Sequence, residues 1–167
     1  MSSMPNPILT VSVLLLLLLG CSRPPSAQGV STWNEIAMIA DNWVLRNQAR
    51  EVLGHTDLSG MPGDKIKEAR AVVETWKGVS PGMNLVSTEV LSLAEYERRL
   101  KEAEQKKPEF FRQNPFPATK WSITPEKVIV YKFHRESSEK VIHDLELELV
   151  IGAFQRDGQW FLSACYN

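Results

Sequence analysis

The sequence predicts an α+β domain in which N-terminal helices pack into a curved antiparallel sheet. Two patterns predict it. Apolar residues follow helical spacing from Trp33 onward, whereas apolar and polar residues alternate as in strands after Ala118. The chain has 167 residues, which is enough for one domain that buries its own core without metals or disulfides.

The first predicted helix opens with Thr32 and Glu35, which have the spacing of a capping box. Apolar residues then recur at intervals of three and four, and further apolar residues widen their face: Trp33, Ile36, Ala37, Met38, Ile39, Ala40, Trp43, Val44 and Leu45. A helix that is apolar on most sides must be covered on most sides. We therefore expect this helix to lie in the concavity of the sheet and to end near Gly54.

A second helix is expected at residues 64–77, after a loop rich in glycine and proline. Residues 84–91 alternate as a strand, with Val86, Thr88 and Val90 on one face. Ser92 and Glu95 then predict another capping box and a charged, solvated helix as far as residue 105.

The remaining strands are expected at residues 121–123, 128–134, 141–154 and 160–166. Odd positions of strand 141–154 are apolar, whereas Asp144, Glu146 and Glu148 lie on the opposite, solvated face. Gly152 predicts a bulge that bends this strand. Asp157-Gly158 predicts a hairpin turn into the last strand, on which we expect Cys165 to be buried.

From Thr32 to Tyr166 the predicted order is helix, helix, strand, helix and an antiparallel meander that ends in Asp157-Gly158-Gln159-Trp160. In this order the chain resembles nuclear transport factor 2-like domains, with the cystatin-like α+β fold as a near neighbour. The resemblance implies a bent sheet that wraps a long first helix into a cone. It also implies a homodimer through the outer sheet face, on which Asp144, Glu146 and Glu148 are expected.

Residues 8–20 form an apolar run that ends in Leu18-Leu19-Gly20-Cys21. The run is shorter than the about 20 residues that cross a bilayer and fits the apolar region of a signal peptide. It resembles the lipobox of bacterial lipoproteins, which implies removal of residues 1–20 and acylation of Cys21, so that membrane lipid is the partner. The alternative is an ordinary secretory cleavage after Ala27, which would leave no lipid.

Residues 21–31 predict a flexible tether, because proline, glycine and serine dominate residues 22–31 without a period. Residues 32–167 then form the single domain. Ser22, rather than Asp, follows the cysteine. In the Gram-negative lipoproteins that this leader resembles, serine there implies the periplasmic face of the outer membrane.

His143 is the candidate catalytic residue, since it shares the odd, apolar face of strand 141–154 with Leu145 and Leu147. In a cone-shaped domain this face would line the cavity, where a histidine can titrate or bind a ligand. The alternative is a partly buried histidine with a structural hydrogen bond. His134 is expected on the facing strand and His55 in a solvated loop, and two histidines do not make a zinc site.

Residues 106–121 interleave basic residues with Phe110, Phe111, Phe116 and Trp121. One interpretation is a contact surface for lipid headgroups, a peptide or another envelope protein, because exposed aromatic patches usually mark contacts. The other is a long connection whose aromatic side chains close the open end of the cone.

The sequence lacks the motifs of common enzymes and cofactor sites, including G-x-S-x-G, H-E-x-x-H, a P-loop and paired cysteines. The net charge of −1 argues against nucleic acid. We therefore expect a lipid-anchored envelope protein with no cofactor and no metal, whose non-catalytic domain binds a small ligand or a protein. The alternative is a small pocket enzyme, an isomerase or hydrolase, that uses His143 as acid–base.

Overall fold

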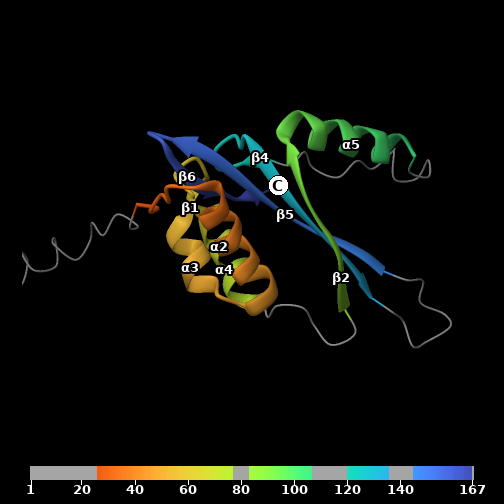
Figure 1. The fold of residues 1–167 in the computed structure, drawn as a ribbon, viewed down its shortest axis with the longest axis horizontal. Coiled ribbons are helices and arrows are strands. Elements are labelled where there is room, and N and C mark those ends of the chain that lie inside the picture. The colour runs from red at the N-terminus through yellow and green to blue at the C-terminus, as the bar shows by residue number, and fades with distance from the viewer. Residues whose placement is uncertain (1–25, 77–82, 107–119, 136–144, 167) are drawn as a thin grey trace, which may run out of the picture.

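A computed structural model describes residues 26–76, 83–106, 120–135 and 145–166, which fold as the predicted α+β class (Figure 1). In these residues four helices accompany a mixed five-stranded sheet of order β1-β6-β5-β4-β2 and a separate pair, β3-β7. The strands are β1 Thr56–Asp57, β2 Met83–Ser92, β3 Lys120–Trp121, β4 Lys127–Arg135, β5 Leu145–Arg156, β6 Gln159–Ser163 and β7 Cys165–Tyr166.

The first helical region consists of two helices, α2 Trp33–Arg46 and α3 Ala49–His55, so the expectation of one long helix was wrong. The capping box is confirmed: Thr32 Oγ1 accepts from the Glu35 amide at 3.2 Å, and the Glu35 carboxylate accepts from the Thr32 amide at 2.9 Å. Asn47 ends α2 because it adopts a left-handed conformation with φ 58°, which asparagine tolerates better than most residues. His55, which was expected in a loop, is the last residue of α3.

The next two helices, α4 Gly63–Thr75 and α5 Leu93–Gln105, confirm the expected positions. Ser92 Oγ accepts from the Glu95 amide at 3.2 Å and caps α5. The Glu95 carboxylate forms ion pairs with Arg98 and Arg99, at 2.7 and 2.9 Å. None of the described helices has the length and apolar character needed to cross a membrane.

The hairpin between β5 and β6 is confirmed, with Asp157 and Gly158 both at positive φ (52° and 75°). This backbone matches the right-handed twist of the two strands. The predicted bulge at Gly152 is absent, because β4 and β5 stay in register through the pair Val128–Gly152. The register shift lies instead in β2, between Leu85 and Ser87.

The predicted last strand, residues 160–166, is two strands with different partners. β6 runs antiparallel to β5 and parallel to β1, and its last residue, Ser163, lies opposite Gly152. β7 pairs with β3 instead. Among the described strands, therefore, the part of β5 that precedes Gly152 has β4 on one side and no hydrogen-bonded strand on the other.

The sheet has helices on both faces (Figure 1). On one face, α2 buries Ile36, Ala40 and Val44 against odd-numbered residues of β4 and β5, which include Ile129, Tyr131, Phe133, Ile151 and Ala153. On the other face, Tyr96 of α5 packs with Val128 and Val130. The Tyr131 hydroxyl donates to Asp41 Oδ1 at 2.6 Å and ties the sheet to α2, and its burial raises the pKa of Tyr131.

Candidate ligand cavity

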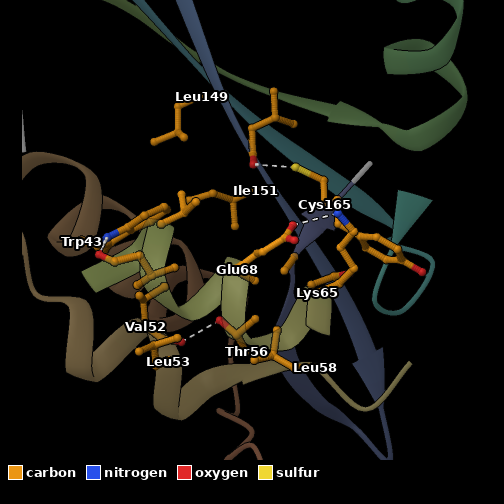
Figure 2. Close-up of a pocket in the computed structure, with 17 residues that line it drawn as sticks. Trp43, Val52, Leu53, Thr56, Leu58, Lys65, Glu68, Leu149, Ile151 and Cys165 are labelled. Atoms are coloured by element: carbon orange, nitrogen blue, oxygen red, sulfur yellow. Dashed lines mark hydrogen bonds and ion pairs between the residues drawn. The ribbon is translucent and has the colours of Figure 1, made fainter. Parts of the chain in front are cut away.

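A cavity of about 420 Å³ lies between α4 and the edge of β5 with which no described strand pairs (Figure 2). Its volume falls in the range of ~300–1,000 Å³ that is usual for small-molecule sites. Most of its walls are apolar side chains from both layers of the domain: Trp43, Val52, Leu53, Val73, Leu149 and Ile151. Such walls select for apolar ligands.

The cavity exists because β6 separates from β5 after one short stretch of pairing. Ser163, at the end of β6, is buried and accepts from the Ile123 amide at 3.2 Å. The next residue, Ala164, donates its backbone N–H to Ser122 Oγ at 3.1 Å. These bonds direct the chain into β7, toward β3. The space beside Leu149 and Ile151, which another strand would otherwise occupy, is left to the cavity.

Two tryptophans hold α4 over this space. Trp43 Nε1 donates to the Val73 carbonyl at 3.1 Å, and Trp76 Nε1 donates to the Val44 carbonyl at 3.0 Å. The two rings lie 6.3 Å apart. These reciprocal bonds fix the C-terminal end of α4 to α2, and they determine how closely the helix approaches the sheet.

The inner side of α4 lies over a hollow rather than over packed core. No residue of α4 is buried, whereas α2 buries five. Ala69 and Val73 are half-buried, and Val72, which also lines the cavity, is 58% exposed. Small side chains on this helix leave space that a larger residue would fill.

The charged residues among the described lining residues are Lys65 and Glu68, whose side chains form an ion pair at 2.8 Å. The hydrogen bond from Lys65 to Glu68 raises the pKa of the ammonium group. In Figure 2, Lys65 and Glu68 lie on the side of the cavity opposite Trp43 and Val52. The cavity is therefore apolar at one end and charged, with both signs, at the other.

Cys165 also lines the cavity, and its thiol donates to the Val150 carbonyl at 3.8 Å. The expectation that this residue is buried was wrong, because it is exposed. β7 lies in the two-stranded sheet at the edge of the domain, which is why a strand residue remains accessible. Neighbouring atoms still desolvate the sulfur and raise the pKa of the thiol, which keeps it protonated and weakly nucleophilic at neutral pH.

A second hollow, of about 800 Å³, lies where the N-terminal segment meets α3 and α4. Gln28 lines it, and its amide donates to the Gly54 carbonyl at 2.8 Å. Arg50, Arg70 and Glu74 line it as well, so its polar groups carry both signs. This hollow shares Leu53, Thr56 and Leu58 with the smaller cavity.

Most of the site residues suggested by the sequence fall outside the described residues: Cys21, Phe110, Phe111, Phe116 and His143. Trp121 is described, and its half-buried ring meets Tyr96 edge-on at 6.3 Å. His134 lies on β4, in register with Glu146 of β5. His55 Nδ1 lies 2.6 Å from the Gln28 carbonyl oxygen. Neither of these two histidines lines the cavity.

Leu149 and Ile151, which line this cavity, belong to the odd, apolar face of β5 on which a cavity was expected, although His143 itself lies outside the described residues. The position of the cavity at the split between β6 and β7 was not predicted, because the strand pattern runs without a break through residues 160–166. The one usable indication was the small residues Ala69 and Ala164, which face this space.

No family model, no curated protein and no solved structure matches this chain. In the part of the chain that the structure describes, no three His, Cys, Asp or Glu side chains gather as metal ligands would.

Proposed function

We propose that this chain is a lipid-anchored protein of the bacterial envelope whose domain binds an apolar ligand in the cavity between α4 and β5. The observation that carries the binding role is the composition of the cavity. Apolar side chains form most of it, and its two charges neutralise each other. A ligand that is polar along its whole length would lose hydration against the apolar walls without gaining partners there.

The anchoring half of the proposal rests on Leu18-Leu19-Gly20-Cys21 and on the place where the chain joins the domain. Gln28 bonds to Gly54, and Val30 exchanges two backbone hydrogen bonds with Trp160, at 2.8 and 3.0 Å. Even fully extended, the seven residue-to-residue steps from Cys21 to Gln28 span only about 25 Å. An acyl group on Cys21 would therefore keep the domain close to the bilayer.

We also propose that the domain is a nuclear transport factor 2-like relative within the α+β class. Support comes from α2, which packs across one face of a sheet formed largely from a C-terminal meander. The same face would form the inside of a cone. The break at Asn47 means that two shorter helices replace the single long one of the family.

Metabolic labelling with an alkyne fatty acid tests the anchor. The full chain, expressed in a Gram-negative host, is expected to incorporate label and to sediment with membranes. Cys21→Ser should abolish both, whereas Cys165→Ser, which removes the other cysteine, should change neither. Recovery of an unlabelled protein that starts at Gln28 would refute lipid anchoring.

Binding of the neutral dye N-phenyl-1-naphthylamine tests the cavity, using the mature chain with Cys21→Ser. Ala69→Phe places a ring in the cavity and is expected to weaken dye binding at least about tenfold, or ~1.4 kcal/mol. Ala71→Phe is the matched control, because Ala71 is exposed on the same helix and does not line the cavity. Equal binding by the two variants would contradict the proposal.

A further inference from the structure

We infer that the cavity takes a single-chain amphiphile with no net charge on its head, held with its acyl chain toward Trp43 and its head at Lys65 and Glu68. This inference rests on the proposed function and names the ligand class of the same cavity. A monoacylglycerol has such a head, and so does a zwitterionic lysophospholipid.

The length of the cavity favours a linear ligand. The residues of α4 that line the cavity run from Lys65 to Val73, which corresponds to about 12 Å of helix. The opposite wall follows β5 from Leu149 to Ile151. A space that follows one helix for more than two turns, along one edge of a strand, suits a linear chain better than a compact ring system.

The polarity of the walls changes from one end of the cavity to the other. Trp43, Val52 and Leu149 surround one end, whereas Lys65, Glu68 and Cys165 lie at the other (Figure 2). An amphiphile has the same gradient within one molecule. A uniformly apolar ligand would place an apolar end beside the charged Lys65 and Glu68. A uniformly polar ligand would lose hydration beside Trp43.

The two charges at the head end favour a head without net charge. The Lys65–Glu68 pair is partly exposed, with side-chain exposures of 31% and 62%. Exposed pairs of this kind are weak, so a ligand head can separate them. An anionic head attracted to Lys65 would be repelled by Glu68. A cationic head attracted to Glu68 would be repelled by Lys65. A zwitterionic head pairs with both, and a neutral polar head is repelled by neither.

Three amphiphiles with the same twelve-carbon chain test the inference: dodecylphosphocholine, dodecanoate and dodecyltrimethylammonium, each below its micelle-forming concentration. The protein is the mature chain with Cys21→Ser, in which Cys165 is the remaining thiol. Two readouts are used, displacement of N-phenyl-1-naphthylamine and protection of Cys165 from alkylation. Dodecylphosphocholine is expected to bind at least about tenfold more tightly than either charged amphiphile.

Two substitutions at the head end sharpen the test without filling the cavity. Glu68→Gln should favour dodecanoate, and Lys65→Gln should favour dodecyltrimethylammonium, each by about tenfold relative to the unsubstituted protein. Ala69→Phe should abolish binding of all three, and Ala71→Phe should leave it unchanged. Circular dichroism of every variant checks that the fold is retained.

The outcomes separate the inference from the proposed function. If the dye binds and Ala69→Phe removes it, but none of the three amphiphiles displaces it, the ligand class is wrong and the cavity remains a binding site. Equal binding of all three amphiphiles would overturn the role given to Lys65 and Glu68. If the dye itself does not bind, both the inference and the binding half of the proposed function fail.

Discussion

The ring of Trp121 occupies the space that a side chain at position 152 would need. A Cβ on Gly152 would lie 2.8 Å from Trp121 Cζ3 and 2.9 Å from Pro125 Cβ, closer than real contacts allow. We expect Gly152→Ala to lower the free energy of unfolding by about 1–3 kcal/mol, because the neighbours must shift to admit the methyl group. Urea unfolding measures this loss.

Gly54→Ala is the matched control for Gly152→Ala. Gly54 is a helical residue of α3, and a Cβ added to it would meet no atom of another element within 4 Å. Alanine is the better helix former, so stability should be unchanged or higher by up to about 1 kcal/mol. If both variants lost equal stability, contact with Trp121 would not explain the glycine at position 152.

Glycines 152 and 158 also show what single residues reveal before the structure is known. Asp157-Gly158 predicts its hairpin correctly, because the turn depends on the backbone preferences of those two residues. Gly152 suggests a bulge for an equally sound local reason, yet its neighbour is a tryptophan 31 positions earlier in the chain. Local preference cannot reveal a contact between distant residues.

At the level of elements, the break between α2 and α3 depends on Asn47. Its φ of 58° lies in the left-handed region, where alanine is less favourable by roughly 1–2 kcal/mol and glycine is not penalised. We expect Asn47→Ala to lower the free energy of unfolding by about 1 kcal/mol and Asn47→Gly to preserve it. Calorimetry compares the two, and equal loss would show that the side chain of Asn47, rather than its backbone, ends the helix.

This break was not predicted from the sequence because the apolar pattern continues across it. Val44 and Val52, on either side of Asn47, are both buried in the same core. Their spacing of eight residues fits one continuous helix. Such spacing predicts that the segment is helical. It does not reveal the break, because a single left-handed residue changes the direction of the helix without disturbing the apolar spacing.

The ion pairs of α5 predict an acid-sensitive helix. Hydrogen bonds from Arg98 and Arg99 lower the pKa of Glu95 from its ordinary value of 4.5 to about 2. A carboxyl group whose pKa is lower in the folded state stabilises the protein above pH 4.5 and loses this contribution as the pH falls toward 2. Glu95→Gln should therefore reduce the difference in thermal midpoint between pH 6 and pH 3.

Glu97→Gln is the control for the acid-sensitivity test. Glu97 is exposed on the same helix and makes no ion pair with the described residues. Its substitution removes the same charge without removing a bond, so the pH dependence should stay that of the unsubstituted protein. An unchanged profile for Glu95→Gln as well would rule out these ion pairs as a source of acid sensitivity.

At the scale of the whole molecule, the class of the fold was predictable and the cavity was not. Apolar and polar residues alternate after residue 118, and apolar residues follow helical spacing before residue 77. These two patterns are sufficient to predict an α+β domain with α2 packed on the sheet. The cavity depends on Ser122 and Ser163, two small polar residues 41 positions apart, which lie 3.2 Å from each other and direct the last strand toward β3. Neither residue belongs to a recognisable motif.

The first described residues contribute hydrogen bonds to the domain. Gln28 donates to Gly54, and Val30 both donates to and accepts from Trp160. Each such hydrogen bond contributes about 0.5–1.5 kcal/mol. Three bonds are lost in a chain that starts at Ser31, so its free energy of unfolding should be about 1.5–4.5 kcal/mol lower than that of a chain that starts at Ser26. Urea unfolding of the two chains makes the comparison, and equal stability would show that residues 26–30 are only a tether, so that the domain begins at Thr32.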